Sequence, residues 1–213
     1  MAEQPGESVW LFIDAQNFYN DARRAFYDPD NDPGAYGQVS PRELGELLVA
    51  KRVAAGRRPC QLERVLIYKG MPSSGREPRG YAAFRRQEAA WKAADVTVFS
   101  RVLQYPEDWP KTTEKPTEKG IDVALAVDLV YHGIRQNYRV AIVASTDTDL
   151  VPALVAVCEQ RRAWHKVDLE VVGFEGVPKR LRVDGEHIRC HYLSLDEFQR
   201  VEDRTDYRQS KKP

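Results

Sequence analysis

The chain has 213 residues, of which 42% are hydrophobic, enough to build the core of one moderately large domain. Its 32 Lys and Arg balance its 32 Asp and Glu, so no overall charge points to nucleic acid or to a membrane surface. Three separated cysteines without a CxxC pair signal neither a disulfide framework nor a zinc knuckle. They favour a reducing, cytoplasmic location, and we expect no targeting segment.

The first element is the apolar run VWLFI at 9–13, which predicts a buried strand. Asp14 follows it directly and places a carboxylate at the end of that strand. Residues 15–27 carry apolar and aromatic side chains at helical spacing, so a helix comes next. Asn17 lies three residues after Asp14 and is able to share a face with it.

The elements between 28 and 103 alternate helix and strand. The Pro- and Gly-rich stretch 28–37 predicts a loop, and Ser40, Pro41 and Glu43 are typical of a helix start. The sequence predicts, in order, a helix to about 55, a strand at 62–68, a loop at 71–80, a helix at 81–94 and a strand at 96–103.

The middle third of the chain is basic. Residues 51–119 hold 15 Lys and Arg against eight Asp and Glu, whereas residues 14–46 hold three against seven. This pattern suits either solvated helix faces or a wall that contacts phosphates. The candidates for backbone contacts are Arg76, Arg79, Arg85, Arg86, Arg101, Lys111 and Lys115.

A long polar loop is predicted at 104–118. Loops of this length in compact domains are usually functional or mobile. Tyr105 and Trp109 in this loop are candidates for stacking on unpaired bases, and loop anchoring is the alternative for each.

Residues 119–133 are apolar nearly all round and predict a buried helix that nevertheless contains Asp122 and Asp128. Buried acids need partners or a cation. Lys119 either pairs with Asp122 or contacts substrate. Asp128 lies six residues after Asp122 and points elsewhere on a regular helix, so a buried hydrogen bond is its main alternative to the site.

The run at 139–144 predicts a central parallel strand, and it ends in Ser145, Thr146, Asp147, Thr148 and Asp149. A helix from 150 follows, since proline at 152 is tolerated near a helix start. One acid at such a turn is ordinary capping, but two leave a functional interpretation equally open. Ser145 is a candidate for either phosphate binding or capping.

The rest of the chain predicts a strand at 167–173, a short helix, a strand at 188–192 and a charged tail. We therefore expect a three-layer α/β/α fold with a mostly parallel sheet. The expected organisation is a flexible N-terminus at 1–7, a single domain at 8–200 and a disordered tail at 201–213. Ligands bind beyond the C-terminal strand ends in such folds, where Asp14, Asp147 and Asp149 fall.

Carboxylates that converge on one crevice repel one another unless they are protonated or neutralised by a metal. Oxygen ligands without His or Cys favour Mg²⁺ or Mn²⁺ over zinc. Such a site can activate water and stabilise charge on a phosphoryl group. Phosphodiester hydrolysis is therefore the hypothesis that the acids support.

Three stretches, FIDAQNFY, EKGIDVALAVDLV and ASTDTDLVPAL, resemble the motifs of the NYN domain of the PIN-like nuclease superfamily. The resemblance implies metal-binding, catalytic acids at Asp14, Asp122, Asp147 and Asp149, with Asn17 assisting. It implies a metal-dependent ribonuclease, an endoribonuclease with Mg²⁺ or Mn²⁺ and water as the nucleophile.

Thr146, Thr148 and Leu150 depart from the usual Ser-Gly-Asp-Ser-Asp-Phe form of the third motif. Both acids remain, and Thr146 and Thr148 join the substrate-binding candidates. The main alternative is a PIN-like module that binds nucleic acid or protein with little or no catalysis. The expected partner is single-stranded or structured RNA, no membrane is expected, and a homodimer is left open.

Overall fold

The computed structural model describes residues 6–163 and 167–209, without the side chains of 161–163. Its centre is a six-stranded sheet in the order β3-β2-β1-β4-β5-β6. Every neighbouring pair is parallel. The strands are β1 (Glu7–Asp14), β2 (Cys60–Met71), β3 (Thr97–Val102), β4 (Val140–Ala144), β5 (Asp168–Phe174) and β6 (Arg189–Leu193).

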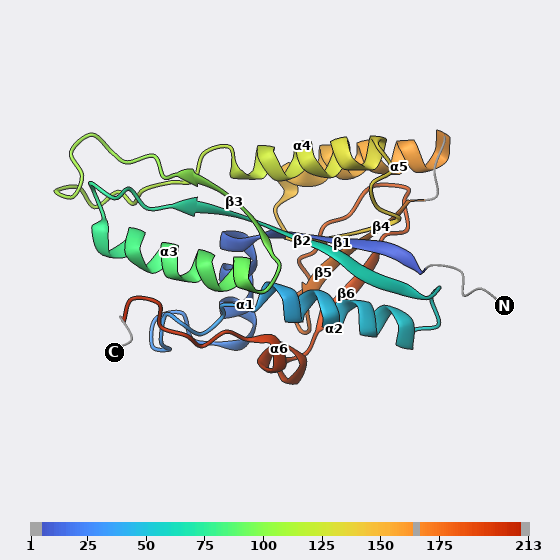
Figure 1. Cartoon of the computed structure of the whole chain (residues 1–213), viewed down its shortest axis with the longest axis horizontal. Coiled ribbons are helices and arrows are strands. Elements are labelled where there is room, and N and C mark those ends of the chain that lie inside the picture. Colours follow the sequence, from blue (N-terminus) through green and yellow to red (C-terminus); the bar gives the residue numbers. More distant parts are fainter. Residues whose placement is uncertain (1–5, 164–166, 210–213) are drawn as a thin grey trace.

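Helices cover both faces of this sheet (Figure 1). One face carries α4 (Ile121–Ile134) and α5 (Val151–Ala163), the latter preceded by the short 3₁₀ turn η1 (Thr148–Leu150). The other face carries α1 (Ala15–Phe26), α2 (Pro41–Ala54), α3 (Pro78–Ala93) and α6 (Leu195–Val201). The predicted three-layer α/β/α fold is confirmed, and the sheet is wholly parallel.

Strand β1 shows why the sequence builds three layers. Its side chains alternate between the two hydrophobic cores: Trp10 and Phe12 pack in the core beneath α4 and α5, and Leu11 and Ile13 in the core on the opposite face. A strand buried on both faces has no polar position until it ends. Asp14 is the first polar residue after this run, so it falls at the rim of the sheet.

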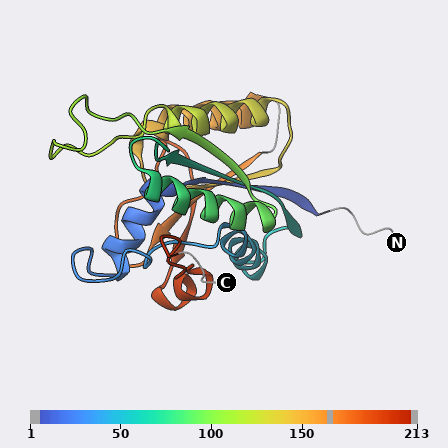
Figure 2. The ribbon, with the colours of Figure 1, turned by 60° about the vertical axis from the view of Figure 1, so that its left-hand side comes forward.

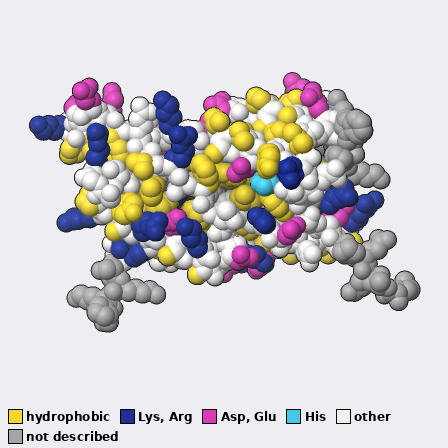
Figure 3. All heavy atoms as spheres, turned by 45° about the horizontal axis from the view of Figure 1, so that its top comes forward, with side chains coloured by type: hydrophobic (Ala, Val, Ile, Leu, Met, Phe, Trp, Pro, Cys, Tyr) yellow, Lys and Arg dark blue, Asp and Glu magenta, His cyan; other side chains and the backbone are white. Residues whose placement is uncertain are grey.

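Helix α4 differs from the helix that the sequence predicted, because it is not buried all round. Val123, Val127, Tyr131 and Ile134 are each at least half exposed. The helix packs on the sheet and against α5, which leaves a third side open to solvent. Figure 3 shows hydrophobic side chains gathered over this layer.

The C-terminal part of the chain also differs from its prediction. No helix forms in residues 175–188, and the short helix α6 instead follows β6. Residues 203–209 lie against the domain: Gln38 donates to the carbonyl of Thr205 over 3.3 Å, and Arg86 Nε donates to the carbonyl of Tyr207 over 2.8 Å. Part of the expected disordered tail thus contacts the domain through its backbone carbonyls, and 210–213 fall outside the described residues.

The N-terminal prediction covers residues 1–7, of which 1–5 fall outside the described residues. Glu7 already begins β1, and its backbone N–H donates to the carbonyl of Pro59 over 2.8 Å. Among the helices that the structure describes, none has the length and apolar character needed to cross a membrane.

Candidate active site

A cavity of about 290 Å³ opens at the C-terminal edge of the sheet. Strands β1 and β4 are neighbours, with Ile13 paired to Ala144, so the residues that follow each strand emerge side by side. The cavity is lined by Asp14, Gln16, Asn17, Asn20, Glu118, Ile121, Asp122 and Asp147. Three of the four acids predicted from the sequence therefore share one cavity.

Asp14 and Asp147 also cap the elements that they precede. Asp14 Oδ1 accepts the backbone N–H of Asn17 over 3.1 Å, and Asp147 Oδ1 accepts that of Asp149 over 3.0 Å. Each carboxylate has two oxygens, so one cap leaves acceptor capacity for the cavity. Asp14 and Asp147 therefore each cap the element that follows and also line the cavity.

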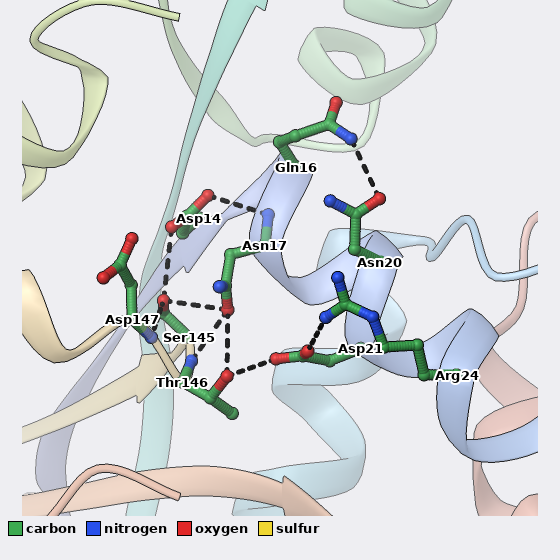
Figure 4. A network of polar contacts seen from close by, with 9 residues as sticks. All are labelled: Asp14, Gln16, Asn17, Asn20, Asp21, Arg24, Ser145, Thr146 and Asp147. Atoms are coloured by element: carbon green, nitrogen blue, oxygen red, sulfur yellow. Dashed lines mark hydrogen bonds and ion pairs between the residues drawn. The ribbon is translucent and has the colours of Figure 1, made fainter. Parts of the chain in front are cut away.

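Asn17 ties the two strand ends together (Figure 4). Its Oδ1 accepts the backbone N–H of Thr146 over 2.8 Å and lies 3.1 Å from Ser145 Oγ. Ser145 Oγ lies 3.2 Å from Asp14 Oδ2 and accepts the backbone N–H of Asp147 over 3.1 Å. Ser145 and Asn17 thus hold the two acids in a fixed relation, and both side chains are occupied in doing so.

Thr146 stands where the usual third motif has glycine, and its hydroxyl makes a contact that glycine lacks. It donates to the carboxylate of Asp21, which also pairs with Arg24 over 2.8 Å. Both Thr146 and Asp21 are buried. Thr146 therefore stabilises the turn from within the protein (Figure 4).

Asp122 enters the cavity from the first turn of α4. Gly120 is the N-cap that precedes this helix, and its φ of +71° is a left-handed conformation suited to glycine. A Cβ there would also come within 2.5 Å of Arg101 Nη1. Lys119 is exposed and forms no ion pair with Asp122 in the part of the chain described.

The electrostatics of the cavity show that its acids are crowded. Burial, together with the negative charges of Glu118 and Asp147, outweighs the hydrogen bonds from Asn17 and Ser145 and raises the pKa of Asp14 from 3.8 to about 6. A carboxyl with this pKa is stabilised by a proton or by a nearby cation.

Glu118 is the acid of the cavity lining that the sequence reasoning missed, and Gln16, Asn20 and Ile121 also line the cavity without having been predicted. Burial raises its pKa, and the charge of Asp122 raises it further, against the hydrogen bond from Gly70 and the charge of Lys69. Burial in turn lowers the pKa of Lys69 to about 8. The only sequence signal was that Glu118 opens the motif stretch that contains Asp122.

Three other candidates lie away from the cavity lining. Thr148 and Asp149 are exposed, and Asp149 lines a neighbouring groove of about 490 Å³ between α4 and α5. Asp128 accepts a hydrogen bond from the hydroxyl of Tyr68 over 2.8 Å, which is the alternative role considered for it. Asp122 lines both hollows.

The basic candidates separate into two groups. Arg85 pairs with Glu88 over 2.6 Å, Arg86 holds the carbonyl of Tyr207, and Arg76 donates to the carbonyl of Pro106 over 3.0 Å. These three are engaged within the protein. Arg79, Arg101, Lys111 and Lys115 are exposed and form no ion pair in residues 6–163 and 167–209.

Tyr105 and Trp109 anchor the long loop after β3, which projects beyond the sheet (Figure 2). The hydroxyl of Tyr105 donates to Glu77 over 2.6 Å and accepts the backbone N–H of Ser73 over 2.9 Å. The Trp109 ring packs edge-on against Tyr105 with the centroids 5.7 Å apart. Both rings therefore pack within the protein and stabilise the conformation of the loop.

The donor set suits a hard divalent cation, since the cavity offers carboxylate and amide oxygens without His or Cys. Among the described residues, no three His, Cys, Asp or Glu side chains converge closely enough to hold an ion as they stand. Mutual repulsion keeps carboxylates apart when nothing neutralises them. Small side-chain movements would be needed to close the site around a cation.

The three-layer fold with acids at the C-terminal edge of its sheet defines a nuclease-like α/β domain. The chain belongs to the NYN domain family, whose model matches residues 8–183, and this family lies within the PIN-like nuclease superfamily. Comparison with curated proteins gives no match. A crystal structure of a protein of unknown function from Vibrio parahaemolyticus is similar, with a TM-score of 0.54 and 13% identity over 93% of this chain and 99% of that one. At this identity the similarity concerns the fold alone.

Proposed function

We propose that the protein is a metal-dependent ribonuclease that hydrolyses RNA phosphodiester bonds. The observation that carries the proposal is the convergence of Asp14, Asp122 and Asp147 on one cavity in a chain of the NYN family. The three acids come from three separate elements. Capping alone would not bring them to a common space.

The acids would hold Mg²⁺ or Mn²⁺, which when bound supplies an activated water and stabilises charge on the phosphoryl group. Ser145 and Asn17 hold Asp14 and Asp147 in register through the hydrogen bonds between the two strand ends. Asp149 was the fourth acid predicted from the sequence, but it lines the neighbouring groove.

RNA would approach across the rim that carries exposed cations. Lys111 and Lys115 lie in the projecting loop, while Arg101 lies against Gly120, the residue that precedes α4. Such side chains neutralise phosphates without reading sequence. The three free cysteines suit a reducing compartment, and we place the protein in the cytoplasm as part of this proposal.

The test is cleavage of labelled single-stranded RNA, structured RNA and DNA with Mg²⁺, Mn²⁺ or EDTA. Asp147→Asn should abolish metal-dependent cleavage, because it removes one anionic ligand and keeps the side-chain shape. Asp184→Asn is the matched control, since Asp184 is exposed in the loop before β6. Tight RNA binding without cleavage by the wild type would instead support a binding module.

A further inference from the structure

Glu118 reaches the cavity because of how the loop before it closes. Gln104 and Thr117 pair through two backbone hydrogen bonds of 2.9 Å each, so the long loop leaves and returns at one point. Glu118 is the residue directly after this closure. The loop therefore delivers its carboxylate to the edge of the sheet, beside the start of α4.

The end of β2 is shaped to receive this carboxylate. Glu118 Oε1 accepts the backbone N–H of Gly70 over 2.6 Å. A Cβ at position 70 would come within 2.7 Å of Glu118 Cγ and 2.8 Å of its Oε1. Glycine at this position therefore lets Glu118 lie against the strand, and one carboxylate oxygen is fixed while the other keeps its acceptor capacity.

Glu118 shares the cavity with Asp14, Asp122 and Asp147, whereas Asp149 does not line it. It is half-buried, while Asp149 is exposed. A half-buried acid beside three others is costly; the charge of Lys69 offsets part of that cost, and a bound divalent cation would offset the rest. Glu118 is well placed to be a metal ligand, because the hydrogen bond from Gly70 already orients its carboxylate.

We propose that Glu118 supplies the fourth carboxylate of the divalent cation site, completing the set formed by Asp14, Asp122 and Asp147. The loop at 104–117 then has a structural purpose, which is to carry this ligand to the sheet edge. This inference rests on the proposed function for the identity of the ion and goes beyond it in the ligand set.

The test is Mn²⁺ binding to the whole protein, measured by isothermal titration calorimetry without RNA. Glu118→Gln keeps an oxygen that accepts from Gly70 and removes only the charge. It should weaken Mn²⁺ binding by at least about 10-fold. Glu114→Gln is the matched control, because Glu114 is an exposed acid of the same loop. The affinity of this variant for Mn²⁺ should stay within about twofold of the wild-type affinity.

Thermal unfolding of each apo variant checks that Glu118→Gln remains folded. Glu118→Gln with wild-type affinity would overturn the inference, as would a loss in Asp149→Asn that Glu118→Gln does not share. Failure of the proposed function would be a separate result. The wild type would bind Mn²⁺ and Glu118→Gln would bind it more weakly, yet the wild type would cut no RNA. No Mn²⁺ binding by the wild type overturns the inference whatever the cleavage assay shows.

Discussion

Asn17 Oδ1 accepts the backbone N–H of Thr146 over 2.8 Å and so joins the first turn of α1 to the turn after β4. The donor is buried, with Thr146 only 3% exposed. Asn17→Ala should lower the free energy of unfolding by about 1–3 kcal/mol, because a buried N–H loses its acceptor. Urea unfolding followed by circular dichroism measures this change.

Gln16→Ala is the control for that prediction. Gln16 is exposed, and among the described residues its side chain bonds only to the neighbouring Asn20, over 3.1 Å. Its effect should stay within about 0.5 kcal/mol. Equal stability of the two variants would mean that Asn17 does not hold the turn.

Asp14 should reduce stability in the absence of metal at neutral pH. Burial and neighbouring charges raise its pKa from 3.8 to about 6, so the folded state disfavours the ionised form that prevails above that pH. Asp14→Asn should therefore stabilise the metal-free protein at pH 8 by roughly 1–3 kcal/mol, since one unit of pKa corresponds to about 1.4 kcal/mol.

The stabilisation of the metal-free protein by Asp14→Asn should depend on pH. As pH falls from about 6 to 3.8, Asp14 becomes protonated first in the folded state, so the advantage of Asp14→Asn shrinks and then vanishes. Urea unfolding in EDTA at pH 8, 6 and 4 tests this. A constant difference across that range would show that the charge of Asp14 is not its cause.

The sequence predicted the parts of the site that follow directly from buried strands. Asp14 and Asp147 each come at the end of an apolar run, and parallel neighbours bring such ends together. Asp122 was predicted because an acid in an apolar helix is conspicuous, and it lines the same cavity. The same reasoning predicted Asp149, which lies in η1 after Asp147, is exposed and does not line the cavity.

Glu118 could not be found in this way, because its position depends on how a polar loop closes. The pairing of Gln104 with Thr117 has no periodic pattern in the sequence. The contacts of the segment after α6 could not be predicted for a similar reason. Its charged composition is typical of disorder, yet its backbone carbonyls are bound by Gln38 and Arg86.

Arg52 should contribute strongly to stability from the opposite end of the sheet. Its side chain is 1% exposed and pairs with Asp168 over 2.7 Å and with Glu170 over 3.1 Å. Arg52→Leu should cost about 3–5 kcal/mol at pH 7, because Glu7, Asp168 and the buried Glu170 all lose the guanidinium that pairs with them. Arg57→Leu, at an exposed position, is the control for urea unfolding.

The cost of Arg52→Leu should depend on pH. Burial raises the pKa of Glu170, but the hydrogen bond from His191 and the charge of Arg52 outweigh it and hold the pKa below its ordinary value of 4.5. The ion pair therefore stabilises the fold above that value and fades as pH falls through the folded-state pKa. Unfolding measured at pH 7 and pH 3.5 should show the difference narrowing, and a widening difference would contradict it.

The exposed lysines of the projecting loop should contact RNA, whereas Arg86 should not. Lys111 and Lys115 have no ion pairs in the described parts of the chain, but Arg86 is committed to the carbonyl of Tyr207. Lys111→Ala with Lys115→Ala should reduce the slope of log affinity against log salt for single-stranded RNA by about 1.4, since each lost phosphate contact removes roughly 0.7.

Arg86→Ala should leave that slope unchanged and instead free the segment at 203–209 to proteolysis. Both variants can be measured by fluorescence anisotropy at several salt concentrations and by limited trypsin digestion. A smaller slope in Arg86→Ala with an intact C-terminal segment would return this residue to the RNA-binding surface. An unchanged slope in the double lysine variant would instead assign the loop to positioning Glu118 alone.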